Sequence, residues 1–349
     1  MGMTTDSSGG LWSVGKLRQI KMITLTAVFA LTMVGTVLAA SLAESPAGAA
    51  APGLQISTSS PAVQGTSAAA CLSTTTCKGS LPLTPQHGYW LVGGDGGIFT
   101  FGSAQFFGST GSFHLQRPIV GIAPTWDHGG YWLVAADGGV FAFGDAGFYG
   151  SIPGLGIAPA GTPGKVHQLN APIVAIVSSG DGGGYYMVAS DGGVFAFGDA
   201  RFAGSCPGLY PNCVAPAVAV MPDASGNGYW VVTAAGVVRH FGDAAQYGAP
   251  GRRFVPVTSA VRTPDGRGYW ILFADGAVFP YGDAVNFGSL PGGVVGGLNP
   301  ATAIFSTADG GAYWVGSAAG AVYPFGDAPN DGSMAGQHLN APVIAAVGW

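Results

Sequence analysis

The amino-acid sequence predicts an all-β fold, a six-bladed β-propeller of four-stranded blades. Three observations support this prediction: a motif repeated along the chain, a composition poor in helix-forming and charged residues, and a strand that is missing before the first repeat but present after the last. Tandem repeats of roughly forty to fifty residues with strand-like content are typical of propeller blades.

The repeated motif reads Gly-Tyr-Trp-(Leu/Val/Ile)-Val-x-x-Asp-Gly-Gly-Val-Phe-x-Phe-Gly-Asp-Ala and occurs six times with small variations. The first aromatic residues of the copies are 42, 54, 44, 40 and 44 residues apart, and they are Tyr89, Tyr131, Tyr185, Tyr229, Tyr269 and Tyr313. Six tandem copies predict one closed array over residues 85–349 rather than several domains.

The composition agrees with a β fold of short strands. Charged residues make up 8% of the 349 residues, against about a quarter in an average globular protein. The chain contains 61 Gly and few of the residues that favour helices. We therefore expect tight turns, short buried strands and very little helix.

The four strands of a blade are clearest in the third copy. They are predicted at residues 171–177, 185–189 and 194–197, with a short outer strand at 201–204. The Asp-Gly step within residues 190–193 suits a tight hairpin between the second and third strands. The strands are continuously apolar, as expected for sheets packed on both faces.

The two ends of the array predict how the ring closes. The first copy begins at Gly88 without an Ala-Pro-Ile-Val strand, whereas a matching strand at 341–347 follows the last copy. We expect the C-terminal strand to complete the first blade, which removes exposed sheet edges. Seven blades remain the alternative if residues 60–87 contribute strands.

The repeats resemble those of the regulator of chromosome condensation family, because a Pro-Ile-Val-x-Ile strand and an aromatic strand precede Asp-Gly-Gly-Val-Phe-x-Phe-Gly-Asp-Ala-x-Phe-x-Gly-Ser. They look closer still to the Gly-Tyr-Trp-Leu-Val-x-x-Asp-Gly-Gly repeats of secreted bacterial proteins. The resemblance implies a propeller of four-stranded blades that is closed by its termini and binds partners through loops on one face.

Members of that family include a nucleotide-exchange factor for a small GTPase and a secreted inhibitor of β-lactamases. This chain departs from the family pattern in three ways. It has Tyr-Trp where the chromosome-associated members favour a His, it has six copies rather than seven, and it begins with an export signal. A nuclear or GTPase-directed function is therefore not implied.

Residues 1–43 are predicted to be a signal peptide. Three basic residues precede an apolar run at 22–40, and small residues follow it. Cleavage after Ala43 or Ala49 fits this pattern, while an uncleaved membrane anchor is the alternative because the run is long enough to span a bilayer. The predicted location is secreted or at the cell surface.

Residues 44–84 are predicted to be a low-complexity linker, rich in Ala, Ser, Thr, Pro and Gly, with one small disulfide loop. The four cysteines form two close pairs, Cys71 with Cys77 and Cys206 with Cys213. Local disulfides in an oxidising compartment are the prediction. A zinc site is disfavoured because the spacing is not Cys-x-x-Cys and no His is adjacent.

The net charge of the chain limits the kinds of partner that it is expected to bind. Without residues 1–43 the chain has 9 Lys plus Arg and 16 acidic residues, a formal net charge of 9 − 16 = −7. A nucleic-acid partner is not expected, since such proteins present a basic face. Contact with a membrane is expected only through an uncleaved N-terminal segment, and the protein is predicted to be a monomer.

The repeat region contains fifteen Asp and no Glu. Fourteen fall in three repeated positions: the hairpin (Asp95, Asp137, Asp191, Asp275), the Gly-Asp-Ala turn (Asp145, Asp199, Asp243, Asp283, Asp327) and the connector before the aromatic pair (Asp127, Asp181, Asp223, Asp265, Asp309). Recurrence favours a turn-stabilising role. No cofactor is predicted; the alternative is a carboxylate ring that lines the central channel and binds Ca²⁺.

No catalytic residues are predicted. The six His share no repeat position, no Gly-x-Ser-x-Gly elbow occurs, and only Asp331 is an acid outside the repeat. The protein is therefore predicted not to be an enzyme. A glycoside hydrolase or lyase with its site at the channel mouth is the first alternative, and a structural envelope protein is the second.

The Tyr-Trp pairs could bind sugars, but their place in the second strands favours packing between blades. An apolar residue is expected to serve the blade equally well there.

The copies disagree most in the insertions, which strand alternation places on the same face as the hairpins. These insertions are residues 111–117, 152–168, 206–213, 248–254, 291–297 and 334–338. Binding sites are often built on loops of a rigid scaffold. The candidate binding residues are Phe113, His114, Arg117, Lys165, His167, Tyr210, Arg252, Arg253, Phe254 and His338. We expect them to recognise an extracellular protein or a cell-wall glycan.

Overall fold

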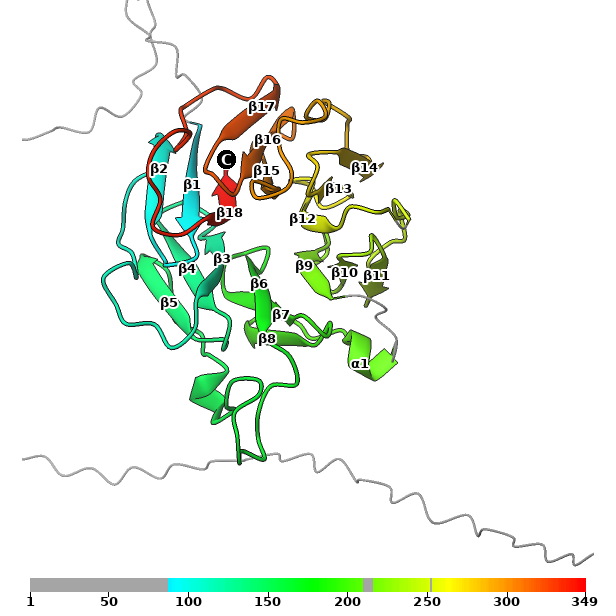
Figure 1. The fold of residues 1–349 in the computed structure, drawn as a ribbon. Coiled ribbons are helices and arrows are strands. Elements are labelled where there is room, and N and C mark those ends of the chain that lie inside the picture. Colours follow the sequence, from blue (N-terminus) through cyan, green and yellow to red (C-terminus); the bar gives the residue numbers. More distant parts are fainter. Residues whose placement is uncertain (1–86, 210–215, 252) are drawn as a thin grey trace, which may run out of the picture. The chain divides into compact units, whose positions relative to one another are not determined.

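The computed structural model describes residues 87–209, 216–251 and 253–349, all of which belong to the compact unit Thr76–Trp349. These residues form eighteen strands in six antiparallel sheets. The helices among them are two single turns, a 3₁₀ turn at Pro153–Leu155 and α1 at Cys206–Leu209. The all-β prediction is confirmed (Figure 1).

Each sheet is one blade of three strands, and we number the blades one to six. With the inner strand first they are β18 (Val343–Gly348), β1 (Gly88–Gly93) and β2 (Ile98–Gly102); β3 (Ile119–Pro124), β4 (Gly130–Ala135) and β5 (Val140–Gly144); β6 (Ile173–Ser178), β7 (Gly184–Ala189) and β8 (Val194–Gly198); β9 (Ala217–Pro222), β10 (Tyr229–Thr233) and β11 (Val238–Phe241); β12 (Val257–Arg262), β13 (Gly268–Phe273) and β14 (Val278–Gly282); β15 (Ala301–Ser306), β16 (Ala312–Ser317) and β17 (Val322–Gly326).

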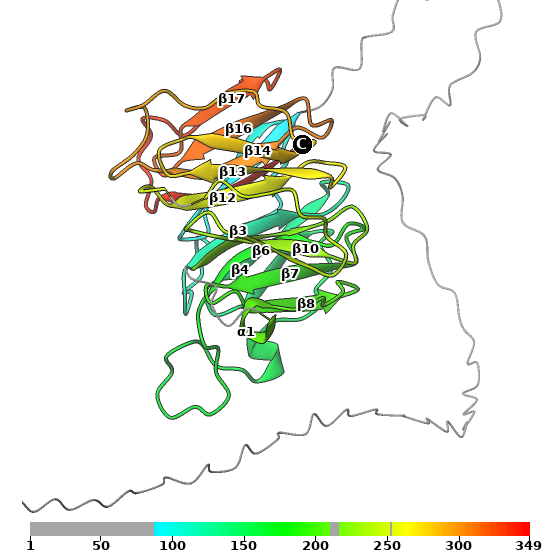
Figure 2. The same cartoon turned by 90° about the vertical axis from the view of Figure 1, so that its right-hand side faces the viewer.

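The inner strands close a ring. β3, β6, β9, β12, β15 and β18 each lie beside the next, and β18 lies beside β3 (Figure 1). The view turned by 90° shows the three strands β12, β13 and β14 of one blade side by side (Figure 2). The C-terminal strand β18 pairs with β1, with Tyr89 opposite Gly348, so it completes the first blade as expected. This arrangement is consistent with six blades. Residues 60–86, from which a seventh would have to come, lie outside the described residues.

The prediction of a fourth, outer strand is wrong. In the third copy the segment 201–204 does not pair with β8. Its backbone groups bind tyrosine hydroxyls instead: the Arg201 N–H donates to the Tyr186 hydroxyl at 2.9 Å, and the Ala203 N–H donates to the Tyr229 hydroxyl of the next blade at 3.2 Å. Gly204, at φ 131°, then leaves the extended conformation.

The middle strands form the core, and their Tyr-Trp pairs pack between blades as predicted. Trp132 is completely buried, and its ring lies 5.6 Å from that of Tyr185 in the next blade. Equivalent contacts join Trp90 to Tyr131 and Trp230 to Tyr269. Burial of each such side chain contributes about 2–3 kcal/mol, so most of the cohesion between blades comes from this layer.

The polar atoms of the same aromatic pairs also bind specific partners. The Tyr131 hydroxyl donates to the Gly108 carbonyl of the preceding blade at 2.5 Å, and the Trp132 Nε1–H donates to the Gly147 carbonyl of its own blade at 2.6 Å. All six first tyrosines repeat the bond between blades, to Gly332, Gly108, Gly150, Gly204, Gly248 and Gly288 in chain order. The expectation that an apolar residue would serve equally well is therefore wrong.

A second set of hydrogen bonds runs around the ring at the hairpins, and we call it the hairpin belt. The Ala136 N–H donates to the Pro118 carbonyl of its own inner strand, and the Ala136 carbonyl accepts from the Ile173 N–H of the next blade, both at 2.9 Å. The same two bonds recur in every blade. The belt closes where the Val343 N–H in β18 donates to the Ala318 carbonyl of blade six at 2.9 Å.

No helix within the described part of the chain is long and apolar enough to cross a membrane. The predicted signal peptide at 1–43, the linker at 44–84 and the Cys71–Cys77 pair lie outside the described residues and stay predictions.

Candidate functional site

The hairpins and the insertions share one face, as expected. The Thr110 N–H donates to the Gly96 carbonyl at 3.2 Å, and the Ile152 N–H donates to the Gly138 carbonyl at 3.1 Å. Each bond ties the start of an insertion to the hairpin of the same blade. We call this surface the hairpin face, and the opposite surface, formed by the loops between first and second strands, the connector face.

The predicted binding residues are exposed but separated on different loops. They are Phe113, His114 and Arg117 after blade one, Lys165 and His167 after blade two, Arg253 and Phe254 after blade four, and His338 after blade six. Tyr210 and Arg252 lie outside the described residues. None of the described candidates lines the central channel.

Arg253 has a local role. Its guanidinium lies 4.9 Å from the centre of the Phe273 ring and 5.1 Å from that of Phe279, and Nη2 lies 3.3 Å from the Asp275 carboxylate. Such a half-exposed ion pair contributes at most about 1 kcal/mol. Arg253 therefore fixes the loop against blade five and is a weaker candidate for partner binding.

Large apolar side chains are also exposed on the hairpin face. Phe113 is 57% exposed and Phe254 is fully exposed. Val166 and Leu298, at 91% and 104%, lie on or beside the insertions and were not predicted. Only aromatic and cationic residues were considered as anchors, so these aliphatic side chains were overlooked.

Cys206 is completely buried at the start of α1. Its predicted partner, Cys213, lies outside the described residues, so the local pairing itself stays a prediction.

The hairpin aspartates stabilise turns, as predicted. Asp137 Oδ1 accepts from the Gly139 N–H at 2.9 Å, and Asp95 and Asp191 bind Gly97 and Gly193 in the same way.

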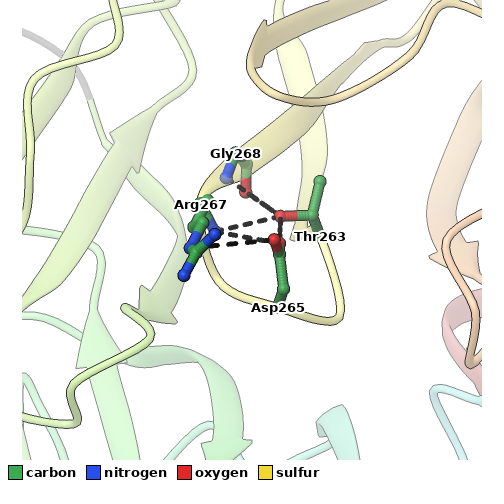
Figure 3. A network of polar contacts seen from close by, with 4 residues as sticks. All are labelled: Thr263, Asp265, Arg267 and Gly268. Atoms are coloured by element: carbon green, nitrogen blue, oxygen red, sulfur yellow. Dashed lines mark hydrogen bonds and ion pairs between the residues drawn. The ribbon is translucent and has the colours of Figure 1, made fainter.

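The connector aspartates form a small polar network, shown for blade five in Figure 3. The Thr263 hydroxyl donates to Asp265 Oδ1 at 2.7 Å, and Asp265 Oδ1 accepts from the Arg267 N–H at 3.2 Å. The Gly268 N–H in turn donates to Thr263 Oγ1 at 2.9 Å. A hydroxyl followed two positions later by a carboxylate thus shapes the connector before the second strand.

Asp223 is not equivalent to the other connector aspartates, contrary to the prediction. Its backbone N–H donates to the Gly228 carbonyl, as the Thr263 N–H does to the Gly268 carbonyl, so Asp223 occupies the threonine position. Ser225 occupies the aspartate position and donates to Asp223 Oδ1 at 3.0 Å. The exchange keeps the hydroxyl–carboxylate bond but buries the carboxylate, since Asp223 is 8% exposed.

Asp223 also lies close to the Gly-Asp-Ala carboxylate of its blade, Asp243, because the Ser225 hydroxyl lies 2.9 Å from Asp243 Oδ1. Burial raises the pKa of Asp223, whereas the hydrogen bond from Ser225 lowers the pKa of Asp243. The two carboxylates therefore differ in their affinity for a proton.

The carboxylate ring that was the alternative to turn stabilisation is not found in the channel wall among the described residues. The inner strands enclose a channel of about 500 Å³, and no aspartate lines it among the described residues. Within that part of the chain, no three His, Cys, Asp or Glu side chains gather where they could hold a metal ion. The aspartates lie in the turns and connectors instead.

The mouth of the channel on the connector face carries side chains that were not predicted. Trp126 is 74% exposed. The His128 ring stacks on Trp349 at 4.3 Å, and Arg262 extends from the end of β12. Trp126 occurs once, at a connector position where other copies have Gly180 or Ala224, so its departure from the repeat could have revealed it.

Beside this mouth lies a second cavity of about 490 Å³, formed by the connectors of blades three to five. Its lining shares Arg262, Pro264 and Ser179 with the channel. The charged side chains that line it are Asp181, Asp199, Arg201, Asp223, Arg262 and Asp265. The structure therefore brings together four aspartates, which the sequence pattern assigns to turns and connectors, and two arginines, to which it assigns no site.

No protein-family model matches the sequence, and the comparison with curated proteins found no significant match. Among solved structures, the β-propeller domain of Myceliophteria thermophila Cps50 (Swd1) is similar, with a TM-score of 0.44 and 9% identity over 70% of this chain and 81% of that one. The strand pairing of the chain itself defines the six sheets of the fold.

Proposed function

We propose that the chain is an exported, non-catalytic binding module that recognises another protein through its hairpin face. The observation that carries this proposal is the exposure of Phe113, Phe254 and Val166 on loops held by a closed ring. Exposed apolar and aromatic side chains are frequent anchors at protein interfaces. A cell-wall glycan at the same face is the alternative ligand.

The N-terminal segment and the cysteines support a location outside the cell. A basic stretch, an apolar run and small residues are typical of a signal peptide. The close spacing of Cys206 and Cys213 suits a local disulfide in an oxidising compartment. The proposed module is a monomer, takes no nucleic acid and needs no cofactor. If it binds no Ca²⁺, its melting temperature will be the same with and without EDTA.

The proposal is tested by capture from envelope extracts with the immobilised chain. The double variant Phe113→Ser with Phe254→Ser is expected to lose the captured protein. Phe148→Ser is the matched control, because Phe148 is 62% exposed in the outer segment of blade two rather than on an insertion. Equal capture by wild type and the double variant would exclude this face.

One observation favours an enzyme as the second candidate function. The cavity on the connector face gathers several carboxylates, and the pKa of one of them, Asp223, is raised by burial. A carboxyl group that retains its proton can act as a general acid in glycoside cleavage. Incubation with oligosaccharides, followed by chromatography of the products, distinguishes an enzyme from a binding module.

A further inference from the structure

We propose that the cavity formed by the connectors of blades three, four and five is a binding site for a saccharide that carries no acidic groups. This site lies on the connector face, so it is independent of the protein-binding function proposed for the hairpin face. The contacts and the repeat pattern of the chain both support it.

The six copies depart from one another at this cavity. Tyr186 stands where the other five copies have Trp90, Trp132, Trp230, Trp270 and Trp314. A phenol ring is smaller than an indole, which leaves room beside blade three. The Tyr186 hydroxyl still binds the backbone of residue 201, as the indole N–H does in the other blades. The substitution thus opens space without removing the hydrogen bond.

Three charged residues at the cavity also differ from the residues at the equivalent positions of the other copies. Arg262 pairs with Tyr269 at a position where other inner strands end in Pro124 or Ser178. Asp223 replaces the connector Thr or Ser, as described above. Arg201 stands where the other blades have Gln105, Gly147, Ala245, Val285 and Pro329. Structural constraints shared by all six blades do not explain these residues, because the other blades form without them.

One charge in the cavity, the Arg262 guanidinium, is available to a ligand. Arg262 is largely buried, and the nearby charges are those of Asp223 and Asp265. Neither of them pairs with it, since the ion pairs within 4.0 Å among the described residues are Arg253–Asp275 and Arg267–Asp265. The guanidinium therefore faces the cavity with donors to offer. Arg201 reaches across the cavity to the side-chain oxygen of Asn227.

An exposed indole lies beside the cavity, at the adjoining mouth of the channel. Trp126 lies against the connector of blade three, where a Cβ added to Gly182 would be 3.2 Å from Trp126 Cδ1. That connector also supplies Ser179 and Asp181 to the cavity wall. An aromatic face next to polar groups that fix orientation is the usual composition of a small-molecule site, and an indole face packs well on the apolar face of a sugar ring.

The hydrogen-bond donors and acceptors that line the cavity indicate which class of saccharide fits it. Among the described lining residues, four aspartates accompany two arginines. Carboxylates accept hydrogen bonds from hydroxyl or amino groups, while the guanidinium donates to ring or hydroxyl oxygens. The excess of negative charge repels uronic acids and phosphorylated polymers. Neutral and amino sugars fit this balance.

The test is titration of the full chain with trisaccharides, monitored by calorimetry and tryptophan fluorescence. The panel contains chitotriose, its fully deacetylated form, cellotriose, maltotriose, xylotriose and trigalacturonate. We expect at least one neutral or amino member to bind and to change the emission of Trp126, and trigalacturonate not to bind. Failure of all neutral and amino members, or preferential binding of trigalacturonate, would overturn the proposal.

The variants give each site residue its equivalent from another copy, so the fold should tolerate them. Tyr186→Trp fills the cavity, Arg262→Ser removes the guanidinium, and Asp223→Ser with Ser225→Asp moves the carboxylate. Each is expected to weaken binding at least tenfold without lowering the melting temperature. Phe148→Asn in the outer segment of blade two is the control, since Asn286 and Asn330 occupy that position in other copies. Wild-type affinity in Tyr186→Trp would refute the site.

Discussion

The hydroxyl of Tyr89 in blade one donates a 2.5 Å hydrogen bond to the carbonyl of Gly332, which follows blade six, 243 residues further along the chain. Burial raises the pKa of Tyr89 above its ordinary value, so the hydroxyl keeps its proton at physiological pH. The bond that joins the last copy to the first is thus the same bond that joins every neighbouring pair of blades. In this respect the closure of the ring is equivalent to its other junctions.

Removing the hydroxyl from one tyrosine tests the bond between blades. Tyr131→Phe leaves the Gly108 carbonyl and the Phe107 N–H without this partner, and an unsatisfied buried group costs about 1–3 kcal/mol. We expect the midpoint of urea denaturation to fall accordingly. Tyr323→Phe, in a third strand, is the control and should have little effect. If Tyr131→Phe were as stable as wild type, packing alone would explain the conserved ring position.

Removal of residues 342–349 tests closure by the C-terminal strand. Without β18, strand β1 loses its inner partner and the hairpin belt loses the Val343–Ala318 bond. We expect aggregation or a fall in melting temperature of more than about 10 °C, since an open edge favours intermolecular pairing. A peptide of residues 340–349 should restore the folded monomer in size-exclusion chromatography. Removal of residues 161–164 from an exposed insertion should have a small effect by comparison.

Substitution of two glycines with positive φ separates the stability cost of backbone strain from the cost of a steric clash. Gly150 has φ 131°, and a Cβ there would lie 2.7 Å from Phe197 Cδ1, whereas Gly164 has φ 72° and nothing within 4 Å. Gly164→Ala should cost about 1–2 kcal/mol through the backbone alone. Gly150→Ala should cost more, and Phe197→Leu should recover part of the loss in a double variant. Equal losses in chemical denaturation would show that the ring contact is unimportant.

The carboxylates of blades four and five should respond to pH in opposite directions. The pKa of Asp223 is raised by burial, so its contribution to stability is complete below its ordinary pKa of 3.8 and is lost as pH rises through the folded value. Hydrogen bonds from Thr263 and from the Arg267 N–H lower the pKa of Asp265, so its contribution is present above 3.8 and is lost as pH falls through the folded value.

Melting temperatures between pH 2.5 and pH 7 check this difference. Asp223→Asn should gain stability relative to wild type as the pH rises above about 4, whereas Asp265→Asn should lose stability relative to wild type as the pH rises from 2.5 towards about 4. The same direction of change in both variants would contradict the raised pKa of Asp223.

The features that recur in every blade were predictable because each copy of the motif contains the residues that form them. The Asp-Gly hairpins, the buried second strands and the closing strand at 341–347 follow from patterns within one copy and from comparing its ends. The absence of a fourth strand was not predictable from the sequence. Residues 201–204 have a strand-like composition, but their backbone binds the hydroxyl of Tyr229 in the next blade. Hydrophobic periodicity carries no information about such partners.

The cavity on the connector face could not be predicted from any single copy. Tyr186, Asp223 and Arg262 are each minor departures within their own repeats, and only the closed ring places the connectors of blades three, four and five side by side. A comparison of the copies position by position finds the departures. The strand topology is needed to show that they meet.

The seam between β1 and β18 has a mechanical consequence. The two strands are antiparallel, and the Trp349 N–H donates to the Gly88 carbonyl at 3.1 Å, so both ends of the described ring lie at the same end of this pair. A force that pulls residue 88 away from residue 349 acts on these hydrogen bonds one after another rather than on all of them at once. β18 therefore stabilises the closed ring against heat but is its weakest element under tension. When residues 88 and 349 are pulled apart, we expect the ring to open first between β1 and β18.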